Sequence, residues 1–267
     1  MTETATTPVQ DEQGTPVLEA RDVAVHFGGV KAVDGLSMTL RAGKIYGILG
    51  PNGSGKSTLL GAMTRLTQLT RGELLFDGEE YHRVPASQVA KKRVARTFQT
   101  VRLLPDLTVR DNIQLGADAR TAEANAPGRL RTMFGGGASP AVADAIARTN
   151  LDGFEDYYPS ELSYGTQRRV EIARAIAMNP RLLLLDEPTA GMNQKERAEI
   201  SKLLQSLRGE GLSQLLVEHD VQMMIDTCDY VFAMNFGHLI AEGTPADVVR
   251  DPQVQEAYLG KKWREHA

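Results

Sequence analysis

The sequence predicts an α/β protein with a mostly parallel β-sheet. Two short and strongly apolar segments, RLLLLDE (181–187) and SQLLVEH (213–219), have the length and composition of buried strands. Between them lies a stretch with helical periodicity, whose apolar face consists of Ile200, Leu203, Leu204 and Leu207. Alternating strands and helices, with continuously apolar strands, are typical of a parallel sheet that helices cover on both faces.

The composition excludes several classes of protein. Of the 267 residues, 42% are hydrophobic, which is enough for a large core without disulfide or metal staples. The single cysteine, Cys228, excludes an intrachain disulfide and a cysteine-rich zinc module. A formal net charge of −4 argues against a general nucleic-acid-binding protein, which usually carries a basic surface, so we expect no nucleic-acid partner.

Neither a membrane span nor a secretory signal is apparent in the sequence. A spanning helix needs about 18 or more apolar residues, and the best candidate, 230–241, is shorter and contains Asn235, Gly237 and His238. Residues 1–16 have neither the basic nor the apolar region of a signal peptide. We therefore expect a cytosolic protein, which can still have a membrane partner.

The sequence predicts several strands and one helix in the first part of the chain. Residues 1–16 are rich in Thr, Glu, Gln and Pro and predict a disordered tail. Strands are expected at 17–27, 36–40 and 44–50, and a helix from Lys56 to about Leu66. Another strand is expected at 72–81, with a turn at Asp77-Gly78.

The region from about 101 to 178 has a different character. Its pattern is predominantly helical, with no convincing buried strand, and three consecutive glycines predict a loop at 133–140. We interpret it as a helical subdomain inserted into the α/β core. From about 230 onwards, two short strands and then two short helices are expected, ending near Gly260.

A glycine-rich loop follows the expected strand 44–50. It fits the P-loop pattern G-x-x-x-x-G-K-[ST] with Gly50, Pro51, Asn52, Gly53, Ser54, Gly55, Lys56 and Ser57. Glycines let backbone N–H groups point at phosphate oxygens, and the following helix aims its positive end at the same anion. In this pattern Lys56 holds the β- and γ-phosphates, Ser57 ligates Mg²⁺ and Thr58 reaches the α-phosphate. The loop predicts a nucleotide site for ATP with Mg²⁺.

Two carboxylates follow the leucine run 182–185. Asp186 and Glu187 stand at the C-terminal end of an expected buried strand, where open α/β sheets bind ligands. Asp186 is predicted to hold Mg²⁺ through water, and Glu187 to orient or polarise the attacking water. Alone, such a run is usually only a strand that reaches the surface, so this prediction depends on the P-loop.

From Val17 to Gly260 the chain resembles the ATP-binding subunits of ABC transporters. The segment LSYGTQRR (162–169), followed by VEIARAIAMNP, looks like the ABC signature. The resemblance implies that Ser163 and Gly165 grip the γ-phosphate held by the opposite subunit. Tyr164 and Thr166 replace the usual glycine and glutamine, and threonine is too short for the ribose contact of that glutamine.

Further residues take their roles from the same resemblance. Gln99, in RTFQT, resembles the Q-loop glutamine that touches Mg²⁺ and the attacking water. His219 resembles the switch histidine that contacts the γ-phosphate. Phe27 resembles the aromatic residue that stacks on adenine, and the alternative is a core aromatic on a strand. Asn193 stands where the D-loop usually has aspartate.

The resemblance also implies a fold. It is a P-loop ATPase core, with a mostly parallel sheet and an antiparallel β subdomain, plus the inserted helical subdomain at about 101–178. We expect residues 17–260 to form a single ABC ATPase domain, flanked by the tail 1–16 and the tail 261–267.

Within ABC proteins, segments such as ARTFQTVRLLPDLTVRDNI and GTPADVVRDPQVQEAYLG are similar to the ATPases of branched-chain amino acid importers. This similarity implies a peripheral ATPase at the cytoplasmic face of the cell membrane, energising uptake of branched-chain amino acids or related small polar solutes. Its partners are membrane permease subunits, a second ATPase subunit (the same chain or a related one) and, indirectly, a solute-binding protein. The run Val101–Leu104 is predicted to line a groove for a permease helix, and the alternative is a place in the internal core. The alternatives are a lipopolysaccharide-export-type ATPase and a soluble, non-transport ABC ATPase.

Overall fold

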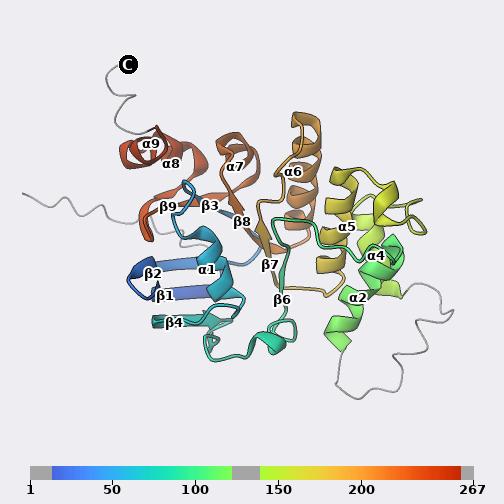
Figure 1. Ribbon diagram of the computed structural model, residues 1–267, viewed down its shortest axis with the longest axis horizontal. Coiled ribbons are helices and arrows are strands. Elements are labelled where there is room, and N and C mark those ends of the chain that lie inside the picture. Colours follow the sequence, from blue (N-terminus) through green and yellow to red (C-terminus); the bar gives the residue numbers. More distant parts are fainter. Residues whose placement is uncertain (1–13, 122–138, 260–267) are drawn as a thin grey trace, which may run out of the picture.

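Figure 1 shows the computed structural model of the protein, which describes residues 14–121 and 139–259. The strands are β1 (Pro16–Phe27), β2 (Val30–Arg41), β3 (Ile45–Leu49), β4 (Arg71–Phe76), β5 (Glu79–Glu80), β6 (Val94–Arg96), β7 (Leu182–Asp186), β8 (Ser213–Glu218), β9 (Tyr230–Asn235) and β10 (His238–Gly243). The α-helices are α1 (Lys56–Met63), α2 (Val109–Thr121), α4 (Pro140–Arg148), α5 (Tyr164–Ile176), α6 (Gln194–Gly209), α7 (Val221–Thr227), α8 (Pro245–Arg250) and α9 (Pro252–Leu259).

The described strands form two sheets. The larger has the order β10-β9-β3-β8-β7-β6, in which every pairing except β10 with β9 is parallel. The smaller has the order β2-β1-β4-β5 and is antiparallel throughout. The expected architecture, a mostly parallel sheet with an antiparallel β subdomain, is confirmed.

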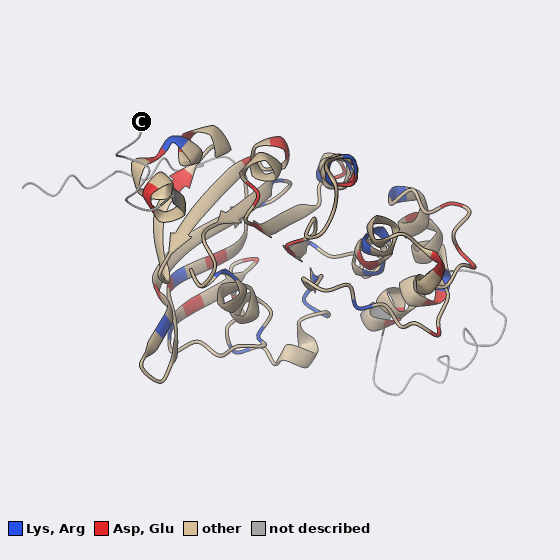
Figure 2. Ribbon diagram, turned by 45° about the horizontal axis from the view of Figure 1, so that its top comes forward, with Lys and Arg blue, Asp and Glu red and all other residues tan. Residues whose placement is uncertain are grey.

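Side chains of the parallel strands alternate between two cores. Along β3, Ile45 and Leu49 belong to the core shared with α5 and α6, while Tyr46 and Ile48 belong to the core shared with α1 and the antiparallel sheet. All five residues of β3, and all five of β7, are buried. Accordingly, Figure 2 shows the charged residues mainly on the helices and the antiparallel sheet, whereas the parallel strands are almost entirely uncharged.

Helices α2, α4 and α5 pack on one another on the side of the molecule opposite α1 and the antiparallel sheet (Figure 1). The described residues of the region 101–178 contain no strand, as the sequence predicts. The expected glycine loop lies largely outside the described residues, which resume at Ser139, the residue before α4. Most of the tail 1–16 and the whole tail 261–267 also lie outside them.

Most elements match the sequence prediction, and the differences have local causes. The turn at Asp77-Gly78 is confirmed, with φ of 52° and 78°, the left-handed pair typical of a tight hairpin. The first helix ends at Met63, earlier than expected, because Arg65 takes a left-handed φ of 60°. The strand expected at 36–40 begins at Val30, and β6 and α7 had no counterpart in the prediction.

Candidate functional site

The P-loop joins the C-terminal end of β3 to the N-terminus of α1, as its motif predicts. Glycines are needed there for space as well as conformation. A Cβ on Gly50 would lie 2.4 Å from the Met234 carbonyl oxygen, and a Cβ on Gly55, where φ is 102°, would lie 2.1 Å from the Ala32 carbonyl oxygen. Gly55 offers no side-chain cap, so the N–H groups of the first turn of α1 remain directed at the loop. The Ser54 hydroxyl is buried without a hydrogen-bond partner, as expected of a group that awaits a ligand.

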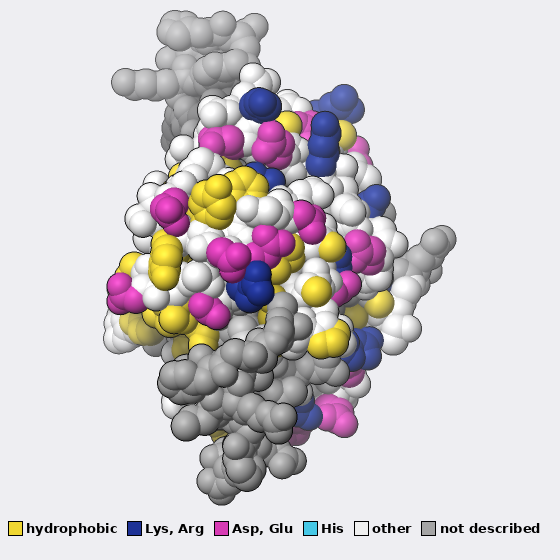
Figure 3. Space-filling view, turned by 90° about the vertical axis from the view of Figure 1, so that its right-hand side faces the viewer, with side chains coloured by type: hydrophobic (Ala, Val, Ile, Leu, Met, Phe, Trp, Pro, Cys, Tyr) yellow, Lys and Arg dark blue, Asp and Glu magenta, His cyan; other side chains and the backbone are white. Residues whose placement is uncertain are grey.

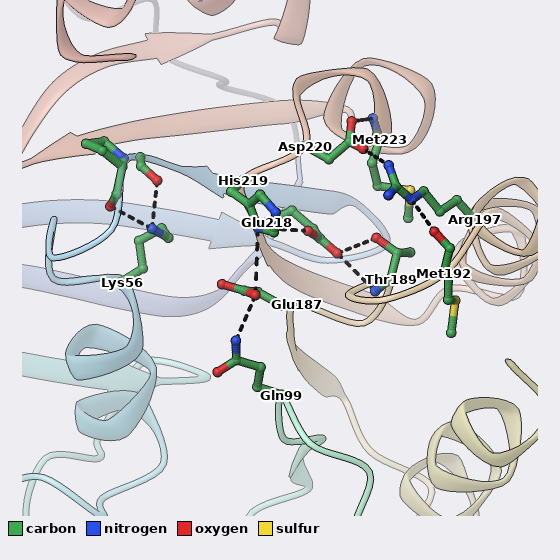
Figure 4. Close-up of polar contacts among 12 residues, drawn as sticks. Lys56, Gln99, Glu187, Thr189, Met192, Arg197, Glu218, His219, Asp220 and Met223 are labelled. Carbon is green, nitrogen blue, oxygen red and sulfur yellow. Dashed lines mark hydrogen bonds and ion pairs between the residues drawn. The ribbon is translucent and has the colours of Figure 1, made fainter. Parts of the chain in front are cut away.

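Lys56 is buried within its own loop. Its Nζ donates to the carbonyl oxygens of Gly50, at 2.7 Å, and Pro51, at 3.0 Å (Figure 4). Burial lowers the pKa of Lys56, and the negative charges of Glu187 and Asp186 oppose that shift. The ammonium group is therefore held by the P-loop backbone, within the electrostatic influence of the two carboxylates, and it can exchange its carbonyl partners for phosphate oxygens.

Asp186, the last residue of β7, and Glu187, the next residue, lie in different environments. Asp186 is buried, and its Oδ2 accepts a hydrogen bond from the Arg96 guanidinium at 2.7 Å. Glu187 follows with a left-handed φ of 43°, a conformation that costs a non-glycine residue about 1 kcal/mol or more. This turn directs Glu187 away from the buried strand and toward Gln99 and His219.

Three predicted site residues meet at Glu187 (Figure 4). Gln99 Nε2 donates to Glu187 Oε2 at 2.9 Å, and His219 Nδ1 lies 3.7 Å from the same oxygen. Gln99 comes from the segment after β6, Glu187 from the end of β7 and His219 from the end of β8. Because β6, β7 and β8 are adjacent and parallel, their carboxyl ends share one edge of the sheet.

The signature segment lies elsewhere. Ser163 is exposed and caps α5, with its Oγ accepting from Thr166 N at 3.2 Å, while Gly165 is in the first turn of the helix. Figure 1 places α5 in the helical group, on the other side of β7 from α1. The fold therefore does not bring Ser163 and Gly165 to the P-loop of the same chain.

Phe27 and Asn193 lie at the margins of the site. Phe27 ends β1 with 55% of its surface exposed, so the alternative of a core aromatic is wrong. Its hairpin reaches the P-loop, because Ala32 of β2 lies against Gly55. Asn193, at the D-loop position, caps α6 in a reciprocal pair of 3.0 Å hydrogen bonds with Glu196.

Several polar residues of the site have no counterpart among the sequence predictions. Arg96 pairs with Asp186. Glu218, at 1% exposure, accepts hydrogen bonds from Thr189 N and Oγ1 and so ties the loop after β7 to the end of β8. Burial raises the pKa of Glu218, while the Thr189 hydrogen bonds oppose the shift. The sequence feature that could have indicated Glu218 is a glutamate at the end of a strand that is buried throughout.

The donors at the P-loop suit Mg²⁺ held together with a nucleotide. Among the described residues, no group of three or more His, Cys, Asp or Glu is arranged to hold a metal ion alone. Ser57, in the first turn of α1, and Asp186 offer one hydroxyl and one carboxylate. Magnesium commonly binds through such a small protein set and takes its remaining oxygen ligands from phosphates and water.

Comparison with known proteins agrees with this geometry. The family described as "ABC transporter" matches residues 33–190, and the family described as "Branched-chain amino acid ATP-binding cassette transporter" matches residues 238–263. The chain is 37% identical to the high-affinity branched-chain amino acid transport ATP-binding protein BraF of Pseudomonas aeruginosa, covering 92% of this chain and 98% of BraF. It is 32% identical to the lipopolysaccharide export system ATP-binding protein LptB of Haemophilus influenzae, covering 93% and 99%.

A solved structure shares the fold. The ADP conformation of MJ1267, an ATP-binding cassette of an ABC transporter, superposes with a TM-score of 0.80 at 28% identity, covering 92% of this chain and 99% of that one. Sequence families, relatives and fold thus agree with the P-loop and the carboxylates at the end of β7. The chain belongs to the ATP-binding cassettes of ABC transporters, nucleotide-binding ATPases that hydrolyse ATP to power transport.

Proposed function

We propose that this chain is the ATPase subunit of an importer for branched-chain amino acids or related small polar solutes. The observation that carries the proposal is the match of residues 238–263 to the branched-chain amino acid cassette family. This segment holds β10, α8 and α9, and it lies outside the region matched by the general ABC transporter family. The greater identity with BraF than with LptB favours the importer over the exporter.

The site residues receive roles from their positions. Gly50 to Thr58 would hold the phosphates of ATP, with Lys56 at the β- and γ-phosphates, and Phe27 would stack on the adenine. Ser57, Asp186 and Gln99 would hold Mg²⁺, which neutralises charge on the phosphates as they react. Glu187 orients the attacking water, Gln99 fixes the Glu187 carboxylate through its 2.9 Å hydrogen bond, and His219 contacts the γ-phosphate.

A second ATPase subunit completes each site in this proposal. Ser163 and Gly165 are separated from the P-loop of their own chain, and a second cassette would place its α5 N-terminus against the nucleotide. The partner is this chain or a related one. In terms of domains, we propose one ATPase domain, 17–260, with a helical subdomain at about 101–178.

Permease subunits would contact the helical side of the molecule, at the cytoplasmic face of the membrane. Figure 3 shows hydrophobic side chains among acidic ones on this side. Leu104 is 48% exposed, and Tyr157 and Tyr158 are each 45% exposed. No helix in the described ranges has the length and apolarity to cross a bilayer.

Solute uptake by intact cells tests the proposal. A strain that lacks this chain should lose ATP-dependent uptake of labelled leucine, the parental gene should restore it, and the Glu187→Gln variant should not. Unchanged uptake of leucine, isoleucine and valine in the deletion strain would refute the solute assignment. Loss of surface lipopolysaccharide in that strain would support the exporter instead.

A further inference from the structure

The most deeply buried charged side chain among the described residues is outside the site itself. Arg168, on α5, has no exposed surface, and its charge is paired with Glu171 one turn later, with Nη1 2.5 Å from Glu171 Oε2. Burying two charges costs free energy that their attraction often fails to recover. Apolar residues of similar volume often stabilise a protein as well as a buried ion pair does, so stability alone does not explain this pair, and its other contacts are informative.

Those contacts are with backbone groups of the segment that carries Gln99. Arg168 Nη1 donates to the Phe98 carbonyl oxygen at 2.7 Å, and Nη2 donates to the Gln99 carbonyl oxygen at 2.6 Å. Glu171 Oε1 accepts from the Arg102 N–H at 3.4 Å. The planar fork of a guanidinium can satisfy two neighbouring carbonyl groups at once, which the point charge of a lysine cannot.

The segment that follows is held in the same manner. Asn112, on α2, has no exposed surface; its Oδ1 accepts from Leu104 N at 2.9 Å, and its Nδ2 donates to the Leu104 carbonyl oxygen at 3.1 Å. The backbone from Phe98 to Leu104 is therefore fixed to α5 at one end and to α2 at the other. Within this segment the Gln99 side chain points to Glu187.

We propose that Arg168 and Glu171 form a positioning pair, which holds the Phe98–Arg102 backbone against α5 so that Gln99 reaches Glu187. The inference rests on the roles proposed above for Gln99 and Glu187. Because α5 begins at the Ser163 cap, the pair also gives a direct polar connection from the signature helix to the carboxylate that orients water. A shift of α5 is then transmitted to Gln99 through hydrogen bonds to two successive carbonyl groups.

Replacing the fork while keeping the charge tests the positioning role. Arg168→Lys should lower kcat for ATP by about 10- to 100-fold, because small misplacements of reacting groups have effects of this size. KM for ATP should change much less, since the P-loop is untouched. The matched control is Arg148→Lys on α4, whose ion pair with Glu210 has no contact with residues 98–102. This control should retain parental kcat.

A double-variant comparison identifies the path. If Arg168 acts through Gln99, Gln99→Ala should slow hydrolysis and adding Arg168→Lys should slow it little further. The inference would be overturned if the two substitutions together lowered kcat by the product of their separate effects. It would also be overturned if Arg168→Lys had parental kcat while Gln99→Ala was slow. If Gln99→Ala itself has parental kcat, the proposed role of Gln99 fails and the positioning role fails with it.

A second variant guards against simple misfolding. Arg168→Met combined with Glu171→Leu replaces the ion pair by an apolar pair, a change that often leaves stability intact. We expect its thermal unfolding to remain close to that of the parent, while amide exchange at residues 98–102 becomes faster and kcat falls. A folded double variant with parental kcat would show that the pair serves stability alone.

Discussion

Glu187 is the residue on which the proposed chemistry of the site depends, and Gln99 and His219 both approach its carboxylate. Glu187→Gln keeps the size and the hydrogen-bonding capacity but removes the charge. ATP binding should survive, because Lys56, Ser57 and Asp186 remain. Turnover should fall by about 10²- to 10⁴-fold, the usual contribution of a general base. The control Glu199→Gln, exposed on α6, should keep parental turnover; parental turnover in Glu187→Gln would show the assignment to be wrong.

Glu218 allows a prediction about pH. Burial raises its pKa in the folded protein, so the folded state binds this proton more tightly than the unfolded state does. The corresponding stability is present below the ordinary glutamate pKa and is lost as pH rises through the raised value. Glu218→Gln abolishes this titration and keeps an acceptor for Thr189. Thermal unfolding should be measured at about pH 4 and about pH 8. The decrease in stability from the lower to the higher pH should be smaller in the variant than in the parent. Equal losses in parent and variant would rule out this account.

At the residue scale, sequence motifs could be predicted from the sequence, whereas contacts between residues far apart in the chain could not. The P-loop and the pair Asp186-Glu187 could be predicted from the sequence because their motifs consist of residues that are neighbours in the chain. Arg96 and Arg168 could not, because their partners lie 90 and about 70 residues away. The helical pattern of RRVEIARAI (168–176) does not by itself reveal that the Arg168 side chain points into the core.

At the scale of elements, the P-loop depends on the backbone of β2. Gly55→Ala would put a Cβ 2.1 Å from the Ala32 carbonyl oxygen at a φ of 102°. We expect the free energy of unfolding to fall by about 1–3 kcal/mol, together with ATP affinity. Gly209→Ala is the control, since that glycine ends α6 with no atom within 4 Å of the added carbon, and it should be neutral or slightly stabilising. Equal thermal shifts in both variants would contradict the packing argument.

The segment after Gln99 offers a test of docking. Leu104 is half exposed, while Leu103 packs against the core. The natural Cys228 is buried, and burial raises its pKa, so it should not react with thiol reagents. Leu104→Cys should react readily in the isolated subunit and be protected, or crosslinked to the permease, in the assembled transporter. Leu103→Cys is the slow-reacting control. Full reactivity of Leu104→Cys in the assembled transporter would exclude this surface from the interface.

Elements differed in how well the sequence revealed them. Long or strongly apolar ones, such as β7, β8 and α6, were evident from periodicity. The three-residue β6 exists because it pairs with β7, and the seven-residue α7 is too short for a helical period to emerge. Both depend on tertiary contacts, which override local preference in short segments.

At the scale of the whole molecule, the P-loop and the signature helix α5 lie on different sides of one chain. In the proposed function, Ser163 and Gly165 hold the γ-phosphate of the opposite subunit. We therefore expect ATP to join two cassettes, each contributing a P-loop to one site and an α5 N-terminus to the other.

The mass of Glu187→Gln in solution, measured by light scattering with ATP and Mg²⁺, tests this central claim most directly. Because the variant binds ATP without cleaving it, the cassettes should remain joined and the measured mass should double, whereas ADP should leave the mass unchanged. Adding Ser163→Ala should weaken the ATP-dependent dimer. The measurement is repeated on a mixture with a related ATPase subunit, because the proposed partner is this chain or a related one. A hydrolysis-deficient variant that binds ATP but forms no ATP-dependent dimer with either partner would contradict the account.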